Sequence, residues 1–316
     1  MSILSNTSAA TDVYLVLGDS VEQTLVTGMF NPIFAGTGID ARLVPVSVKP
    51  ENLNAFVTNA LVAKNIKGFW VSHGLQSAVM AVLDQCSSLG RMAGAVNAVR
   101  RNADDKLEGA LFDGVGFIAS LIYFGISYAD KRVLILGSGG SAAAIAASLA
   151  RAEDAVCAAE IAIYDVAASH AVEVAQRIAL ATGTPVYAVA SNDPAGFDLV
   201  VNATSLGSYP GDPLPCDVAR MEPHACVLDL VLQNQPTALL RAARARGLQA
   251  QPGYEMLVQQ AQLYLDFLGY TQAAGMLRRD ASVLRQQLYP LALQHEIHPQ
   301  LPSESEFSPF TFSTLP

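Results

Sequence analysis

The fold is decided by the stretch Val133-Leu-Ile-Leu-Gly137-Ser-Gly139-Gly140-Ser-Ala142. An apolar, strand-like run comes directly before the pattern G-x-G-x-x-A, and a run of small helix-forming residues follows it. Gly137 permits a tight turn, Gly139 lets the backbone approach a diphosphate, and Ala142 lets the helix pack close to the strand. Free N–H groups at the start of such a helix attract phosphate. The stretch therefore predicts a strand, a turn and a helix that bind a dinucleotide.

An acidic residue follows where this interpretation requires one. Asp165 ends the next apolar strand, roughly 20 residues further on, where a carboxylate can accept hydrogen bonds from the adenosine ribose hydroxyls. A carboxylate there would repel a ribose 2′-phosphate. The next residue is Val166, not an arginine that could bind that phosphate. The sequence therefore predicts NAD as the cofactor, with NADP as the less favoured alternative.

Strand-like and helix-like segments alternate along the rest of the chain, which predicts the α/β class. Near-continuous apolar strands, typical of a parallel sheet covered on both faces, are expected at 133–136, 161–165, 185–189, 199–202 and 227–230. Earlier strands are expected at 13–18, 41–46, 68–71, 95–99 and 107–111. Helices are expected at 24–31, 51–63, 77–83, 113–124, 255–268 and 271–288.

Composition excludes several classes of protein. Hydrophobic residues make up 51% of the 316 residues, enough for real cores and too many for a disordered chain. The net charge of −9, without a basic stretch, argues against nucleic acid or a membrane surface as a partner. The four cysteines form no C-x-x-C pair, so no metal site is expected. Residues 1–12 lack the features of a signal peptide, which predicts a cytoplasmic protein.

Four further segments resemble the shikimate dehydrogenase family, over roughly residues 12 to 285. They are Gly94-Ala-Val-Asn97, which looks like the family's G-A-V-N; Asp198-Leu-Val-Val-Asn202-Ala-Thr204-Ser205-Leu206-Gly207, which looks like D-x-V-x-N-A-T-x-x-G; Asp229-Leu-Val231, which looks like D-x-V; and Pro252-Gly253-Tyr-Glu-Met256-Leu257-Val-Gln-Gln260-Ala261, which looks like G-x-x-M-L-x-x-Q-A. The resemblance implies an N-terminal α/β substrate domain (1–113), a Rossmann-type doubly wound domain (114–251), C-terminal helices that return to the first domain (252–290) and an extended tail (291–316).

The resemblance also implies a lysine and an aspartate beside the reacting C–O group. The aspartate falls on Asp113, within Gly109-Ala-Leu-Phe-Asp113-Gly114. The lysine position falls on Gln76, at the end of Trp70-Val-Ser72-His73-Gly74-Leu-Gln76, and no lysine lies between residues 68 and 105. A glutamine amide can donate a hydrogen bond but cannot exchange a proton near neutral pH, and losing a positioned acid–base group typically costs on the order of 10²–10⁴ in rate.

Other positions of the family's substrate pocket are partly kept. Thr24, Ser72, Asn97 and Gln260 match its polar substrate contacts. Hydroxyl, amide and tyrosine side chains of the family are replaced elsewhere by apolar ones, at Val26, Leu111, Phe112 and Leu232. The pocket should therefore prefer a substrate with more apolar surface, or with fewer hydroxyls, than shikimate. By the same resemblance and the turn motif, the expected cofactor-binding residues are Gly137, Ser138, Gly139, Gly140, Ser141, Asp165, Asn202, Thr204, Ser205, Leu206, Val231, Gly253 and Leu257.

Several of these residues also have a purely structural interpretation. Asp113 could simply stabilise the start of its helix. His73 could replace the missing lysine as a proton carrier, or be held by local hydrogen bonds. Gln260 could reach the substrate or fill the packing between domains. Trp70 could form a pocket wall or belong to the core.

Three functions remain open at this point. The first is an NAD-dependent oxidoreductase that transfers hydride between the nicotinamide and a cyclic hydroxy acid or related alcohol or carbonyl, with a place in aromatic amino acid biosynthesis. The second is a relative with weak or no dehydrogenase activity that binds NAD and a ligand as a sensor or partner-binding module. The third is a related enzyme acting on another carbonyl or an imine. The expected partner is a small-molecule substrate, and a homodimer is left open.

Overall fold

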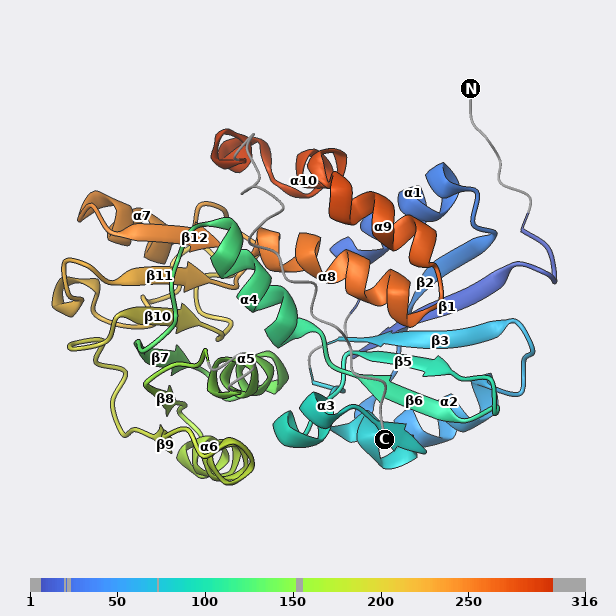
Figure 1. Cartoon of the computed structure of the whole chain (residues 1–316), viewed down its shortest axis with the longest axis horizontal. Helices are drawn as coiled ribbons and strands as arrows, with labels where there is room; N and C mark the ends of the chain where they lie inside the picture. The colour runs from blue at the N-terminus through green and yellow to red at the C-terminus, as the bar shows by residue number, and fades with distance from the viewer. Residues whose placement is uncertain (1–6, 20, 22–23, 73, 152–155, 298–316) are drawn as a thin grey trace. The chain divides into compact units, whose positions relative to one another are not determined.

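The computed structural model describes residues 7–19, 21, 24–72, 74–151 and 156–297. The contacts within the chain divide it into two compact units (Figure 1). Unit 1 consists of Met1–Phe112 and Ala261–Ala281, and unit 2 of Asp113–Gln260 and Ser282–Pro316. Each unit has its own six-stranded sheet flanked by helices. This confirms the predicted α/β class with a Rossmann-type domain.

Unit 2 is built around a sheet whose strand pairings are all parallel. In spatial order its strands are β12 (Gln249–Pro252), β11 (Cys226–Asp229), β10 (Leu199–Asn202), β7 (Arg132–Leu136), β8 (Glu160–Tyr164) and β9 (Val186–Ala188). The first of these in the chain, β7, therefore lies in the middle, and the order reverses between β7 and β10. This is the doubly wound order of dinucleotide-binding domains, which bind ligands at the carboxyl ends of the strands beside that reversal.

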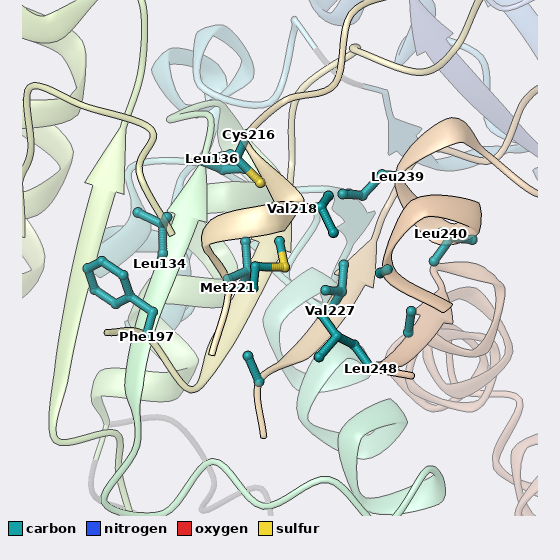
Figure 2. Packing of buried hydrophobic residues seen from close by; sticks show 14 of the residues in the cluster. Leu134, Leu136, Phe197, Cys216, Val218, Met221, Val227, Leu239, Leu240 and Leu248 are labelled. Atoms are coloured by element: carbon teal, nitrogen blue, oxygen red, sulfur yellow. The ribbon is translucent and has the colours of Figure 1, made fainter. Parts of the chain in front are cut away.

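One face of this sheet is covered by a cluster of buried apolar side chains (Figure 2). Leu134 and Leu136 of β7 share it with Leu239 and Leu240 of α7 (Ala238–Ala245). The intervening residues of β7 point to the opposite face and are buried as well, so both faces of the strand are covered. Helices α5 (Gly140–Ala150) and α6 (Ala168–Thr182) pack against the strands β7, β8 and β9.

Two glycines bring helix α4 (Asp113–Tyr123) unusually close to its neighbours. A Cβ atom on Gly114 would lie 2.1 Å from the carbonyl oxygen of Ala144 in α5. A Cβ atom on Gly116 would lie 2.8 Å from the carbonyl oxygen of Met256 in α8 (Tyr254–Phe267). Since backbone atoms cannot move aside as a side chain can, only glycine fits at either position. Within unit 2, α4 is therefore held between α5 and the start of α8.

Unit 1 carries a mixed sheet. In spatial order its strands are β2 (Ala41–Ser47), β1 (Asp12–Gly18), β3 (Ile66–Val71), β5 (Ala98–Arg101), β6 (Leu107–Ala110) and β4 (Gln85–Cys86). The first three run parallel to one another, and β5 is antiparallel to both β3 and β6. The helices of this unit are α1 (Leu25–Thr37), α2 (Leu53–Ala60), α3 (Ser88–Ala93) and α9 (Thr271–Arg279), with the second half of α8.

Several expected segments differ in detail; the helix expected at 24–31 continues to Thr37, and the strand expected at 95–99 spans Ala98–Arg101. The single helix expected at 271–288 is two helices, α9 and α10 (Ser282–Leu288), because Asp280 has an extended backbone with φ −154°. The helix expected at 77–83 is a 3₁₀ helix, Ala78–Val82. The tail expected to be extended begins with another 3₁₀ helix, Leu291–Glu296, which is fixed because Glu296 pairs with Arg244 at 2.8 Å. Residues 298–316 of that tail lie outside the described residues.

Candidate active site

The glycine turn after β7 has the geometry that its sequence requires. Gly137 has φ +103°, a conformation that other residues rarely adopt, and a Cβ atom there would lie 2.7 Å from the carbonyl oxygen of Ala203. Gly139 precedes the first residue of α5, and apart from its chain neighbours no atom of the described residues lies within 4 Å of the place that its Cβ would occupy. The start of α5 is therefore open to a group that approaches its backbone N–H groups.

Asp165 follows β8 directly and is tied to this turn. Its Oδ2 accepts hydrogen bonds from the backbone N–H of Ser138 (2.8 Å) and from the Ser138 hydroxyl (2.7 Å). Its Oδ1 accepts one from the backbone N–H of Ala167 (2.8 Å). A carboxylate offers about four acceptor positions. These three bonds occupy both positions on Oδ2 and one on Oδ1, so about one position on Oδ1 can still accept a hydrogen bond.

The same contacts favour the ionised form of the Asp165 carboxyl group. Burial by itself would raise the pKa of its carboxyl group. The hydrogen bonds from Ala167 and Ser138, together with the nearby His170, outweigh that effect and lower the pKa below its ordinary value. His170 contacts the Ser138 hydroxyl through Nδ1 at 2.8 Å. His170 was not among the predicted site residues, although its place at the start of α6, five residues after Asp165, was a usable signal.

The loop after β10 is shaped by the amide of Asn202, which is fully buried. Its nitrogen donates to the carbonyl oxygen of Leu206 (3.0 Å) and to Asp229 Oδ1 (2.8 Å). Its oxygen accepts from the N–H (3.1 Å) and hydroxyl (2.6 Å) of Thr204. These four bonds use the whole hydrogen-bonding capacity of the amide. Asn202 therefore builds the loop 203–207, and any cofactor contact there falls to the loop that it supports.

Asp229, at the end of β11, helps to hold this loop in place, because its Oδ1 accepts a hydrogen bond from the Asn202 amide. Burial raises the pKa of its carboxyl group above the ordinary value, against hydrogen bonds from Thr237, Val231 and Asn202. The Thr237 hydroxyl donates to Asp229 Oδ2 at 2.5 Å. A Cβ atom on Gly253 would lie 2.9 Å from Cα of Leu230, so the start of α8 passes close to this segment. Of the remaining residues expected to bind a cofactor, Thr204, Ser205, Leu206 and Val231 follow strands of unit 2 at their carboxyl ends, and Leu257 lies in the first turn of α8.

Asp113 is the first residue of α4 and belongs to unit 2, together with the glycine turn. Its side chain is buried, with 6% of the residue exposed. Asp113 Oδ2 accepts a hydrogen bond from the Ser141 hydroxyl of α5 (2.7 Å), and Oδ1 accepts one from Nε2 of Gln260 in α8 (3.1 Å). The structure thus brings together three residues that the sequence analysis had assigned separate roles.

In unit 1, three other candidates lie around the carboxyl end of β3. Ser72 follows β3 directly. The side chain of Gln76 is buried, and its Nε2 donates to the carbonyl oxygen of Val71 at 3.4 Å. The backbone carbonyl of Asn97 accepts from the N–H of the same Val71 (2.8 Å), and Asn97 Oδ1 accepts from the N–H of Phe112 (2.9 Å). Thr24 caps the start of α1, since its hydroxyl accepts from the N–H of Val26. His73 lies outside the described residues.

Trp70 belongs to an aromatic cluster of unit 1. Its ring stacks on Tyr264 with centroids 4.9 Å apart and meets Phe30 edge to face at the same distance. The Tyr264 hydroxyl donates to the carbonyl oxygen of Asn97. Trp70 is 3% exposed, and among the described residues its indole N–H has no hydrogen-bond partner. The core interpretation of Trp70 is therefore the one that the structure supports. The sequence analysis missed Tyr264, which carried no motif of its own.

Within the described part of the chain, no helix is long and apolar enough to cross a membrane. Those residues also contain no group of three or more His, Cys, Asp or Glu side chains arranged to hold a metal ion.

Comparison with known proteins identifies the family. Residues 16–99 match the shikimate dehydrogenase substrate binding domain. The shikimate dehydrogenase (NADP(+)) of Rubrobacter xylanophilus is 35% identical over 84% of this chain and 94% of its own length. The 5-ketofructose reductase of a Gluconobacter strain is 32% identical, with a TM-score of 0.74 over 88% of this chain and 98% of that one. A shikimate dehydrogenase crystallised with NADP⁺ is 25% identical, with a TM-score of 0.77 over 92% of this chain and 100% of that one. As its motifs predicted, the chain belongs to the shikimate dehydrogenase family.

Proposed function

We propose that this chain is a nicotinamide-dependent oxidoreductase of the shikimate dehydrogenase type that uses NAD(H) in preference to NADP(H). One observation carries the cofactor preference: the Asp165 carboxylate is fixed beside the glycine turn by Ser138 and Ala167. A carboxylate there accepts a hydrogen bond from a ribose hydroxyl and repels a 2′-phosphate. Val166, which is 92% exposed, adds no positive charge. The Rubrobacter relative is named for NADP(+). We expect Asp165 and Val166 to give the present chain a different cofactor preference.

Unit 2 offers a place for each part of the dinucleotide. The open N-terminus of α5, at Gly139 and Gly140, would receive the diphosphate. The remaining acceptor position on Asp165 Oδ1 would bind the adenosine ribose. The loop 203–207 and the segment at Gly253 would line the nicotinamide end. When bound, the nicotinamide supplies or accepts the hydride, and the protein supplies orientation and electrostatics.

Asp113 is the residue that we assign to the reacting hydroxyl or carbonyl group. Its carboxylate is held by Ser141 and Gln260 in one orientation and can accept a hydrogen bond from a substrate hydroxyl. Gln76 would orient the substrate oxygen by donating a hydrogen bond from its amide. It would not transfer a proton, since an amide does not exchange protons near neutral pH. The proton of the reacting hydroxyl group would be exchanged with Asp113 or with solvent. The reaction should therefore be slower than that of an enzyme with a lysine at position 76.

The substrate is proposed to be a cyclic hydroxy acid or a related alcohol or carbonyl compound with fewer polar groups than shikimate. Leu111 and Phe112 are 2% exposed and apolar where the family pattern has polar residues. Phe112 packs against Tyr264 and Phe267 at centroid distances of 5.1 and 5.6 Å. The relatives differ in substrate as well, since one is named for shikimate and another for 5-ketofructose.

The test is a kinetic comparison of NADH with NADPH, using a panel of 3-dehydroshikimate, 3-dehydroquinate, 5-ketofructose and the less polar 3-oxocyclohexanecarboxylate. We expect a lower KM for NADH with whichever substrate reacts. Val166→Arg should lower the KM for NADPH, because it adds a cation beside the 2′-position. Val172→Arg, the same change at a 41% exposed position of α6, is the matched control and should change neither KM. A wild-type preference for NADPH would refute the cofactor assignment.

The alternative predicted from the sequence, a binding protein without dehydrogenase activity, receives no support from the comparisons. The same panel addresses it. NADH consumption with any substrate of the panel excludes it, whereas flat traces together with NADH binding by calorimetry would exclude the oxidoreductase proposal for this panel.

A further inference from the structure

We propose that Ser141 is a positioning residue that ties the carboxylate of Asp113 to the phosphate-binding turn. This inference rests on the proposed function, in which Asp113 contacts the reacting group. It assigns to Ser141 a role different from the cofactor contact expected from its place in the G-x-G-x-x-A motif.

The first observation is the hydrogen bond itself. The Ser141 hydroxyl lies 2.7 Å from Asp113 Oδ2, and both residues are buried, with 7% and 6% exposed. A hydroxyl has one proton to donate, and a carboxylate can only accept, so the donor is fixed. A hydrogen bond to a charged group in a buried place is among the stronger ones in proteins.

The second observation is that Asp113 is held from two sides. Gln260 donates to Oδ1 from α8, while Ser141 donates to Oδ2 from α5. Two donors on different oxygens stop the carboxylate from rotating about its last side-chain bond. Removing the Ser141 hydroxyl would take away the donor on Oδ2, and the carboxylate would be held less firmly in this orientation.

The third observation is the placement of Ser141 in the chain. It is the second residue of α5 and follows Gly140, whose backbone belongs to the phosphate-binding turn. The same helix contacts α4 through Gly114, the neighbour of Asp113. The backbone around Ser141 and its side chain therefore serve different purposes. In the proposed function the turn would receive the dinucleotide, while the hydroxyl sets the direction of the carboxylate on the neighbouring helix.

The test compares Ser141→Ala with a matched control, Ser148→Ala. Ser148 lies on the same helix, and its buried hydroxyl oxygen has no hydrogen-bond partner among the described residues. We expect Ser141→Ala to lower kcat about 10- to 100-fold, because a misplaced catalytic group costs rates of this order. The KM for NADH should stay within about threefold, since the turn itself is unchanged. Ser148→Ala should match the wild type in both constants.

Two further variants separate positioning from mere packing. Ser141→Thr keeps the hydroxyl and should recover most of kcat, whereas Ser141→Cys keeps the size but donates weakly and should not. In the Asp113→Asn background, Ser141→Ala should cause little further loss, because residues that act as a unit are not additive. If Ser141→Ala fails to fold, the contrast between the Thr and Cys variants decides the question in its place.

The outcomes distinguish this inference from the function on which it rests. A wild-type chain inactive on the whole panel, or an Asp113→Asn variant as active as the wild type, overturns the proposed function and the positioning role with it. An inactive Asp113→Asn variant together with an unchanged kcat in Ser141→Ala overturns only the positioning role. A raised KM for NADH with unchanged kcat would show that the hydroxyl serves the cofactor, which also overturns it.

Discussion

Gly114→Ala tests how Asp113 is held in unit 2. A Cβ atom at this position would lie 2.1 Å from the carbonyl oxygen of Ala144 and 2.2 Å from Oγ of Ser148. Ordinary contact begins at 3.4 Å, so α4 would have to move away from α5 by about 1.3 Å. Overpacking of this kind typically costs about 1–3 kcal/mol of stability. For a domain of this size, the melting temperature should fall by roughly 2–12 °C.

The same displacement should also lower the rate of catalysis. Asp113 is the residue before Gly114, and its hydrogen bond to Ser141 of α5 is 2.7 Å long. A shift of about 1 Å would break that bond, and a misplacement of this size can lower kcat up to about 10²-fold. Thermal unfolding measures the first effect, and steady-state kinetics with saturating NADH measure the second.

The matched control is Gly36→Ala, in α1 of unit 1. Outside its own helix turn, no atom in the described part of the chain lies within 4 Å of the added Cβ atom, and the residue is exposed in a helix. Alanine should therefore stabilise the protein by about 0.5–1 kcal/mol and leave kcat unchanged. A Gly114→Ala variant with the stability and kcat of the wild type would show that α4 and α5 do not meet at Gly114, which would refute this account of how Asp113 is positioned.

Two further changes test the supports of the site. Arg285 pairs with the fully buried carboxylate of Glu255 at 2.7 Å. Arg285→Met leaves that carboxylate without its cation and should destabilise the protein by about 3–5 kcal/mol in urea titrations. A loss below about 1 kcal/mol would contradict this. Asp165→Asn should reduce the free energy of unfolding by a constant amount above about pH 5. Since the pKa of Asp165 is lowered in the folded state, its contribution is present above the unfolded value of 3.8 and is lost as pH falls through the folded value. A difference between variant and wild type that grows toward acid would have the wrong sign.

The fold could be predicted from the sequence where local patterns and glycines dictate the structure. The apolar run before Gly137 and the glycine turn predicted β7, the turn and α5, and the structure has them at Arg132–Leu136 and Gly140–Ala150. The motifs also predicted the family correctly. Asp165 was expected immediately at the end of β8 and lies directly after it.

What the sequence could not provide were contacts between distant segments. Ser141 and Gln260 meet at Asp113 although Gln260 is 147 residues away from it in the chain. Nothing in the local sequence of Asn202 indicates that its amide is used up by loop contacts. The division of helix 271–288 was missed because the apolar spacing continues across Asp280, where the backbone is nevertheless extended. Tertiary packing decided each of these points.

A crystal structure of the protein grown with NADH would test directly whether the glycine turn and Asp165 bind the dinucleotide. We expect the diphosphate to lie over the turn at Gly137–Gly140, with a hydroxyl of the adenosine ribose within hydrogen-bonding distance of Asp165 Oδ1. A structure in which NADH lies elsewhere, or in which the ribose hydroxyls point away from Asp165, would contradict this expectation.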